Sequence, residues 1–506
     1  MKYQHCFSLL AGLLVAAAHA APPNIVYILA DDMGYGDVTA LNPDSKIKTP
    51  HLDQLAGEGM VLTDAHSSSS VCTPTRYGLL TGRYNWRSRI KKGVLMGYSP
   101  RLIEPDRITV ADLLRKQGYH TTCVGKWHLG MDWPEGEDRF TKPIKNGPTA
   151  VGFDHFWGIS ASLDMPPYVY INDSLPVAVP SVTTGAFGRR GLAAEGLDPS
   201  DVLPDLTDHA VEVIRERATT ARNGTPFFLY FPLPAPHTPI APTDEWKGKS
   251  GLNKYGDFVM QVDSTVGRIT QALKDHGLQD DTLIVFTADN GCSPAAKIPE
   301  MHAKGHYPNH HFRGHKADIF EGGHRVPFIV RWPGKVKAGS SSDQLTCLTD
   351  LMATCADITG AKLPPNAGED SISILPALLG KAAEPLREAV VHHSINGSFA
   401  IRSGKWKLIF CPGSGGWSAP RPGKAGQGLP SQQLYNLEED IRETTNLEAA
   451  HPEVVTRLTK LMEQYVDKGR STPGPKQANT GATDFRTGQK TSTPQKKKQP
   501  AKKQAR

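Results

Sequence analysis

Cys72 and Arg76 stand four residues apart in the segment Cys72-Thr73-Pro74-Thr75-Arg76. Pro74 suits the first turn of a helix, because the N–H that proline lacks has no intrahelical partner there. The segment predicts a helix that begins near Cys72 and ends at Gly82, with Arg76 on the same face as the thiol. A helix N-terminus favours anions, so this arrangement predicts a site for a tetrahedral oxyanion. A cysteine that merely packs in the core is the simpler interpretation of Cys72 alone.

Two runs of apolar, branched residues predict buried strands, and each is followed at once by acidic or amide side chains. The runs are residues 24–30 and 282–288, and the side chains that follow are Asp31, Asp32, Asp289 and Asn290. Open α/β sheets bind ligands at the carboxyl ends of their strands, so we expect these four residues to meet. Carboxylate and amide oxygens suit Ca²⁺ or Mg²⁺ rather than Zn²⁺. Acids after a single strand can also simply cap a turn.

Four further polar residues lie near predicted strand ends or in glycine-rich loops: Lys126, His128, His237 and Lys316. Lys126 and His128 are two apart beside a strand predicted over 120–124, so their side chains can point the same way. His237 follows a buried strand predicted over 226–232. Each has a plainer alternative, since a histidine near a strand end is often structural and a lysine is usually solvated.

Taken together, these residues resemble the type I sulfatases. The resemblance rests on Cys72-Thr73-Pro74-Thr75-Arg76 with Leu80-Thr81-Gly82-Arg83, and on the stretch from Gly118-Tyr119 to Gly125-Lys126-Trp127. It runs from about Pro23 to Leu379 and continues more loosely to residues 434–437. In that family a formylglycine-generating enzyme oxidises the motif cysteine to formylglycine, whose hydrate is the nucleophile beside one Ca²⁺.

The resemblance implies roles for individual residues. The implied calcium ligands are Asp31, Asp32, Cys72, Asp289 and Asn290, and the implied catalytic residues are Cys72, Arg76, Lys126, His128, His237, Asp289 and Lys316. It implies hydrolysis of a sulfate monoester, with a sulfated carbohydrate or an aryl sulfate as substrate, and release of inorganic sulfate. Asp289 would deprotonate the attacking hydroxyl, His237 and Lys316 would assist the leaving alcohol, and His128 would help expel sulfate.

Two alternatives stay open at this point. One is a phosphodiester or phosphonate ester hydrolase with the same fold and nucleophile. The other is a catalytically silent protein that binds sulfated glycans.

Strands alternate with helices over most of the chain, which predicts an α/β fold. The resemblance implies a large mixed sheet sandwiched by helices, of the alkaline-phosphatase-like kind. From about residue 386, short strands with tight turns predict a smaller antiparallel α+β domain. We therefore expect a signal peptide over 1–20, a catalytic domain over 21–385, a C-terminal domain over 386–470 and a disordered basic tail over 471–506.

The N-terminus and the overall charge suggest where the protein acts. Lys2, the apolar run from Phe7 to Ala18 and Ala18-His19-Ala20 predict export to the periplasm or beyond. No later run is long enough for stable membrane insertion. The net charge is +6, but nine lysines and arginines against one acid lie in the tail, so the body is nearly neutral and we expect no nucleic-acid partner. The remaining cysteines require no disulfide framework.

Aromatic and basic residues in loops are candidates for contact with a polyanionic glycan. They are Trp157, Tyr168, Tyr170, His302, His310, His311, Arg313 and His393. The first three lie in an irregular, Pro- and Gly-rich stretch from Trp157 to about Leu203, and such long insertions usually belong to surface or binding loops.

Overall fold

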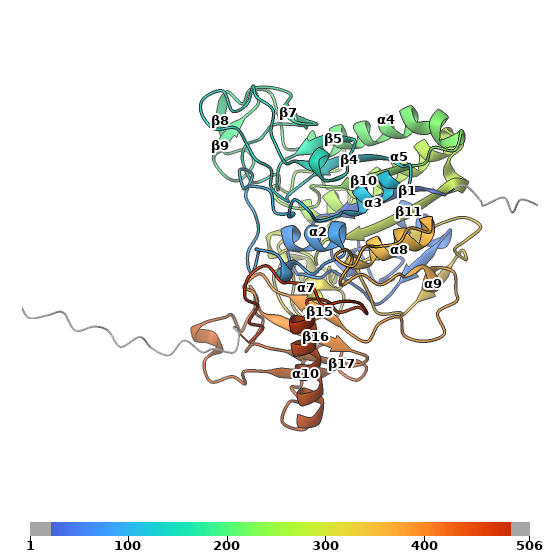
Figure 1. Ribbon diagram of the computed structural model, residues 1–506. Helices are drawn as coiled ribbons and strands as arrows, with labels where there is room; N and C mark the ends of the chain where they lie inside the picture. Colours follow the sequence, from blue (N-terminus) through green and yellow to red (C-terminus); the bar gives the residue numbers. More distant parts are fainter. Residues whose placement is uncertain (1–21, 487–506) are drawn as a thin grey trace, which may run out of the picture.

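A computed structural model describes residues 22–486. Its centre is a ten-stranded mixed sheet (Figure 1). Across the sheet the strands are β13 (Ser340–Ser342), β2 (Met60–Leu62), β12 (Phe328–Arg331), β11 (Thr282–Ala288), β1 (Asn24–Ala30), β10 (Phe227–Pro232), β4 (His120–Lys126), β5 (His155–Ile159), β6 (Ile171–Asn172) and β7 (Leu175–Pro176).

The middle of this sheet is parallel, from β11 through β1, β10 and β4 to β5. Every residue of β1, β10 and β11 is buried, as expected of strands covered on both faces. The carboxyl ends of these strands therefore share one edge of the sheet, and the polar residues that follow them are brought together there.

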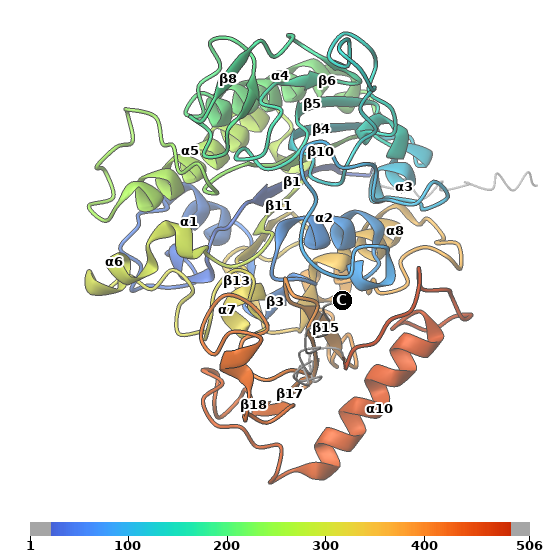
Figure 2. The same ribbon diagram turned by 90° about the vertical axis from the view of Figure 1, so that its left-hand side faces the viewer.

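Helices cover both faces of the sheet, as Figure 2 shows around β1 and β11. One layer holds α1 (Pro50–Gly57), α4 (Val202–Arg222) and α5 (Lys254–Asp275), and the other holds α2 (Cys72–Thr81), α3 (Val110–Lys116) and α8 (Leu351–Thr359). Three short helices lie in the connecting loops: α6 (Ile298–Ala303), α7 (Glu321–His324) and α9 (Leu375–Leu378).

A separate four-stranded antiparallel sheet forms the C-terminal domain. It comprises β15 (Val390–His393), β16 (Phe399–Ser403), β17 (Trp406–Ile409) and β18 (Gln433–Asn436), with α10 (Pro452–Lys468) packed against it (Figure 1). Two small pairs complete the fold, β3 (Ala65–His66) with β14 (Thr346–Cys347) and β8 (Val182–Thr184) with β9 (Gly191–Ala193). The predicted fold class is confirmed.

The start of the predicted disordered tail is wrong for residues 471–486. Phe485 is only 4% exposed and packs edge-on against Phe410. Buried Arg83 donates to the Ala478 carbonyl at 2.6 Å, and the Thr480 N–H donates to the Arg87 carbonyl at 2.7 Å. The segment is held by backbone groups and one aromatic anchor, neither of which a search for apolar periodicity detects. The predicted signal peptide and residues 487–506 lie outside the described residues.

No helix within residues 22–486 is long and apolar enough to cross a bilayer. The six cysteines of this part are all buried and unpaired.

Candidate active site

Cys72 is the first residue of α2, and the preceding Val71 is extended. The helix ends where Gly82 adopts a left-handed φ of 62°, as the sequence predicts. Every residue of α2 is buried, and Cys72 itself is only 2% exposed. Its sulfur lies within 4.8 Å of carboxylate oxygens of Asp31 and Asp289. The helix therefore points its N-terminus at the polar edge of the sheet.

Arg76 joins three of the predicted site residues. Its Nε and Nη2 donate to Asp289 Oδ2 at 3.2 and 2.9 Å, and Nη2 lies 3.7 Å from Asp31 Oδ2. Its Nη1 donates to the Lys126 carbonyl at 3.0 Å. The guanidinium is fully buried, so these contacts fix its position.

Lys126 lies at the end of β4, directly after Gly125. A Cβ on Gly125 would lie 2.0 Å from the Pro232 carbonyl oxygen, and its φ is 134°, so only glycine fits there. Lys126 Nζ lies 2.5 Å from Asp31 Oδ2 and 2.6 Å from Ser162 Oγ. Ser162 is a site residue that our sequence analysis missed. Its only signal was a polar serine shortly after a short apolar stretch, inside a region predicted to be irregular.

Two further basic side chains, those of Lys316 and His237, lie next to Asp32. Lys316 Nζ lies 2.6 Å from Asp32 Oδ1, and His237 Nε2 lies 3.7 Å from Asp32 Oδ2. Asn290 donates through Nδ2 to Asp32 Oδ1 at 2.8 Å. The fold thus brings Lys316 and His237 to one carboxylate from loops far apart in the chain.

His128 approaches the site with one nitrogen engaged and one free. Its Nε2 lies 2.8 Å from the Leu95 carbonyl, so Nε2 carries the hydrogen and Nδ1 keeps its lone pair. Nδ1 is buried and has no partner among residues 22–486. Burial and the charge of Lys126 hold the pKa of His128 well below its usual range.

The two carboxylates nearest Cys72 differ in acidity. Burial raises the pKa of Asp31, but Lys126, His237 and Arg76 outweigh burial and hold it well below its usual range. Burial and the neighbouring Asp31 raise the pKa of Asp289 to about 7. Opposed shifts in adjacent carboxyl groups are typical of acid–base sites. Burial also raises the pKa of the Cys72 thiol, so an unmodified Cys72 is not an activated nucleophile.

Two buried oxygens in the site lack partners. Asp31 Oδ1 and Asn290 Oδ1 accept no hydrogen bond from any residue between 22 and 486. Buried polar atoms are normally satisfied, and oxygens of this kind are the ligands that Ca²⁺ takes. With Asp32 and Asp289 beside them, the donor set fits a hard divalent cation.

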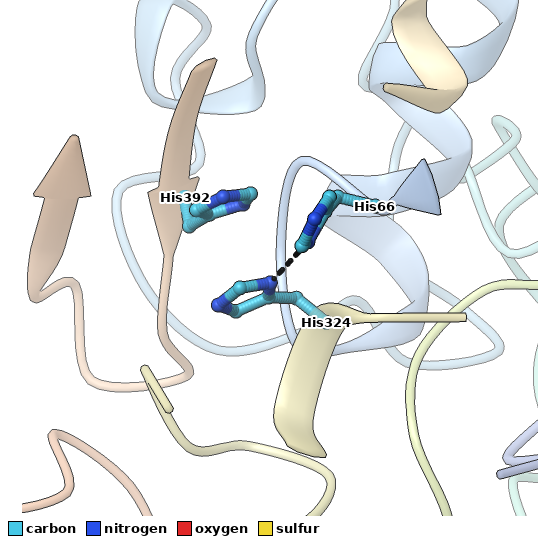
Figure 3. Close-up of side chains that lie close together, drawn as sticks. All are labelled: His66, His324 and His392. Atoms are coloured by element: carbon cyan, nitrogen blue, oxygen red, sulfur yellow. Dashed lines mark hydrogen bonds between the residues drawn. The ribbon is translucent and has the colours of Figure 1, made fainter. Parts of the chain in front are cut away.

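A second polar cluster lies away from this site, between the two domains. Figure 3 shows His66 of β3, His324 of α7 and His392 of β15, all fully buried. The Nδ1 atoms of His66 and His324 are 3.0 Å apart, and His66 Nε2 lies 2.8 Å from Asp64 Oδ1. Lys407 Nζ lies 3.1 Å from His324 Nε2. One set of tautomers satisfies this chain: Lys407 donates to His324, which donates to His66, which donates to Asp64.

This histidine cluster is poorly arranged for a metal ion. The rings of His324 and His392 are stacked, with centroids 3.7 Å apart and planes 9° from parallel. Lone pairs in parallel ring planes do not converge on one ion, and the Lys407 ammonium already occupies one nitrogen. The cluster therefore links the domains and is not a second metal centre.

Several residues proposed to reach a glycan are instead packed inside the protein. Tyr168, Tyr170 and His393 are buried, and Trp157 stacks on His209 with centroids 3.9 Å apart. The prediction is wrong for Tyr168 and Tyr170, because the irregular stretch folds back on β5 and α4. It is wrong for His393 because this residue ends β15, where its ring packs against Asn85 and Phe399.

A sequence profile described as Sulfatase matches residues 23–361, more than half of the chain. The chain belongs to the sulfatase family. This sulfatase also matches a profile described as N-sulphoglucosamine sulphohydrolase, C-terminal, over residues 310–417. The membership and the relatives below make it a sulfuric ester hydrolase, as expected.

Named relatives span nearly the whole sulfatase. It is 33% identical to an N-acetylgalactosamine-6-O-sulfatase of Bacteroides thetaiotaomicron, over 87% of this chain and 92% of the relative. It is 35% identical to arylsulfatase A of Bos taurus, over 90% of each chain.

Solved structures share its fold. A sulfatase structure from work on glycosaminoglycan metabolism in Bacteroides thetaiotaomicron has a TM-score of 0.78 at 33% identity, covering 88% of this chain and 99% of the other. A phosphonate monoester hydrolase of Agrobacterium radiobacter is alike in fold alone, with a TM-score of 0.55 at 22% identity, covering 87% of this chain and 94% of the other.

Proposed function

We propose that this sulfatase hydrolyses sulfate monoesters of a sulfated carbohydrate, with a formylglycine made from Cys72 and one bound Ca²⁺. The observation that carries the proposal is the surroundings of residue 72. It sits at a helix N-terminus beside Asp31 and Asp289, and Arg76, Lys126 and Lys316 oppose the carboxylates of the site. Substrate and product are both anions, so such a site stabilises the charge that develops during hydrolysis.

Calcium would be held by Asp31, Asp32, Asp289, Asn290 and the modified residue 72, and it would supply a fixed positive charge against the sulfate oxygens. Its fit rests on the unpartnered oxygens of Asp31 and Asn290. The three carboxylates are already opposed by three basic side chains, so a divalent ion leaves the site positive for an anionic ester.

Formylglycine, as its hydrate, supplies one hydroxyl to attack sulfur and a second whose deprotonation expels sulfate. Asp289 lies within 4.8 Å of residue 72, and burial and Asp31 raise the pKa of its carboxyl group, so it would accept the proton of the attacking hydroxyl. Lys316 and His237 lie together on Asp32 and would donate to the leaving alcohol oxygen. His128 Nδ1 keeps a free lone pair and would take the proton of the second hydroxyl.

The proposed substrate is a sulfated sugar, because relatives at 30–33% identity carry names such as N-acetylgalactosamine-6-sulfatase. N-acetylgalactosamine 6-sulfate is accordingly the first compound to test. We also propose that the chain is exported to the periplasm or beyond and is modified by a formylglycine-generating enzyme.

The test is a comparison of rates with enzyme co-expressed with a formylglycine-generating enzyme. We expect turnover of 4-nitrophenyl sulfate and of sulfated sugars, and much slower turnover of 4-nitrophenyl phosphate and phosphonate esters of the same phenol. Faster turnover of the phosphorus esters would favour the phosphodiester or phosphonate hydrolase alternative. Binding of sulfated glycans with no turnover of any ester would favour the silent binding protein.

A further inference from the structure

A cavity of about 240 Å³ lies between the loops that carry Asn42 and Tyr307. It is lined by Asn42, Asp44, Tyr307, His310, His311 and Arg442. Two of these, His310 and His311, were sequence candidates for glycan contact. Its volume is smaller than that of an ordinary drug-sized pocket, which suits a single sugar ring.

The walls of this cavity continue the loops that carry the site residues. Gly36 N–H donates to the Pro308 carbonyl at 2.7 Å, and a Cβ on Gly34 would lie 2.0 Å from the same oxygen. The loop that contains Tyr307 and His310 ends at Lys316, which is bonded to Asp32. Close backbone contact therefore fixes the cavity next to the segment that follows Asp32.

The same loop is tied to the end of β11. Asn309 Oδ1 accepts from the Cys292 N–H at 2.8 Å, two residues after Asn290. The cavity and the proposed cation site thus share both of their supporting segments.

The cavity offers an aromatic surface and neutral hydrogen-bonding groups. Tyr307 is 50% exposed and packs on one side against His302, with centroids 4.7 Å apart. An exposed aromatic ring with a polar tip suits the half-apolar face of a sugar. Burial, His311 and Arg325 lower the pKa of His310 to about 4, so it is neutral, and its buried Nδ1 has no partner among the described residues.

Arg442 gives the cavity a preference for anions. It is exposed, and within residues 22–486 its guanidinium pairs with no carboxylate. Asp44, the one acid of the lining, forms no ion pair in that range either and can accept from sugar hydroxyls. A guanidinium binds a sulfate or carboxylate through two parallel hydrogen bonds.

We propose that this cavity binds the anionic sugar that adjoins the sulfated sugar being hydrolysed, with Tyr307 against its ring and Arg442 on its carboxylate or sulfate. The inference rests on the proposed function and narrows its substrate to an oligosaccharide with charge on neighbouring sugars.

The test compares Arg442→Ala and Tyr307→Ala with the control Arg457→Ala, which removes an exposed arginine from α10. The substrates are 4-nitrophenyl sulfate, N-acetylgalactosamine 6-sulfate and a chondroitin 6-sulfate tetrasaccharide. For the tetrasaccharide we expect both variants to raise KM about tenfold with kcat unchanged, as for loss of uniform binding. The two small substrates and the control should not change. A tetrasaccharide whose carboxylates have been reduced to alcohols identifies the group that Arg442 binds. If that group is the carboxylate, Arg442→Ala should no longer change KM for the reduced substrate. If it is the sulfate, Arg442→Ala should still raise KM.

A binding measurement separates this inference from the proposed function. Calorimetry of the tetrasaccharide with Cys72→Ala enzyme needs no turnover, and adding Arg442→Ala should weaken binding about tenfold. The difference in tetrasaccharide affinity between enzymes with and without Arg442 should also become smaller as the salt concentration rises. The proposal would be overturned if Arg442→Ala and Tyr307→Ala left the affinity for the tetrasaccharide unchanged. It would also be overturned if the two variants raised KM for N-acetylgalactosamine 6-sulfate as much as for the tetrasaccharide. Unchanged thermal midpoints exclude misfolding as the cause.

Discussion

Asp31 and Asp289 show how strongly position governs a side chain in this protein. Both are buried aspartates within reach of Cys72. Lys126, at 2.5 Å, holds the pKa of Asp31 below its usual range, whereas burial and the charge of Asp31 raise the pKa of Asp289. On the proposed function, the two carboxyl groups thereby have different tasks, Asp31 as a fixed charge and Asp289 as a group that exchanges a proton.

At residue 72 we expect formylglycine in protein from a competent host. Burial raises the pKa of the thiol, and a thiol or a single hydroxyl cannot expel sulfate as a hydrate can. Peptide mass spectrometry of active enzyme should find the aldehyde or its hydrate, and Cys72→Ser and Cys72→Ala should abolish turnover of 4-nitrophenyl sulfate. Full activity of protein that carries only thiol at this position would refute the mechanism.

A substitution of Asn290 tests the proposed calcium site and leaves the net charge of the site unchanged. Asn290→Ala removes an unpartnered buried oxygen, and we expect calcium affinity to fall about tenfold or more. Elemental analysis should find calcium in the wild type, and chelation should lower its thermal midpoint until calcium is restored. Asn366→Ala, at an exposed position, is the matched control. Stoichiometric zinc without calcium would contradict the assignment.

At the scale of elements, the segment 471–486 acts as a strap over the end of α2. Arg83 and Arg87, just beyond that helix, bond to Ala478, Asn479 and Thr480 of the strap. A chain ending at Arg470 loses these partners and the burial of Phe485. We expect its free energy of unfolding to fall by about 3 kcal/mol or more, as measured by denaturant unfolding.

A chain ending at Arg486 keeps every one of these contacts and is the control for that truncation. A tail that is disordered from residue 471, as the sequence predicts, would make truncation after Arg470 cost no stability. Equal stability of the two shortened chains would therefore show that the strap contributes nothing.

The elements predicted best are those whose own composition demands burial. The bounds of β1 and β11 are as predicted, because each is a short, mostly apolar run that acidic residues follow at once. By contrast, α8 starts only at Leu351, although similar residues precede it, since Thr346 and Cys347 pair with β3. Short strands β6 to β9 were also missed. These segments are strands because they pair with neighbouring strands, and their own sequences carry no strand pattern.

The candidate site divides in the same way. Residues next to a strong local signal, such as Asp31 after β1 and Cys72 at a helix start, were found from sequence with the family resemblance. Ser162 was missed, because its role depends on Lys126 arriving from a distant strand. The lining of the cavity beside Tyr307 was found only in part, since Arg442 reaches it from the C-terminal domain.

At the scale of the whole molecule, the C-terminal domain holds both sides of the active site. The Ser70 N–H donates to the His393 carbonyl at 3.1 Å, and the Ala317 N–H donates to the Ser70 carbonyl at 2.8 Å. The Ile395 N–H in turn donates to the Ala317 carbonyl at 3.2 Å. This closed set of backbone hydrogen bonds ties the loop before Cys72 and the residue after Lys316 to the end of β15.

The histidine cluster between the domains predicts loss of stability in acid. Burial is the main cause that lowers the pKa values of His66, His324 and His392 in the folded state. The unfolded chain therefore binds more protons, so the free energy of unfolding falls as pH drops below about 6.5. Each proton that the unfolded chain binds and the folded protein does not lowers the free energy of unfolding by about 1.4 kcal/mol per pH unit. Denaturant unfolding between pH 8 and 5 measures this slope.

His392→Phe isolates the effect of one histidine. A phenyl ring retains the stacking on His324 and cannot take a proton, so the dependence of stability on pH below 6.5 should become shallower. His155→Phe, at an exposed position, should leave the slope unchanged. Identical slopes in all three proteins would mean that the buried acids nearby, Asp64 and Glu321, control the acid response instead.

The strap also has a consequence for the order of events during synthesis. Ribosomes make the chain from its N-terminus, and the helix that carries Cys72 emerges long before residues 471–486. The last cover over the end of α2 can form only when nearly the whole chain has been made. Until then the helix lacks part of its packing, and residue 72, which the finished protein buries, is open to the modifying enzyme that we propose. On that proposal, catalysis needs the helix covered and maturation needs it uncovered, and the order of residues along the chain separates the two in time.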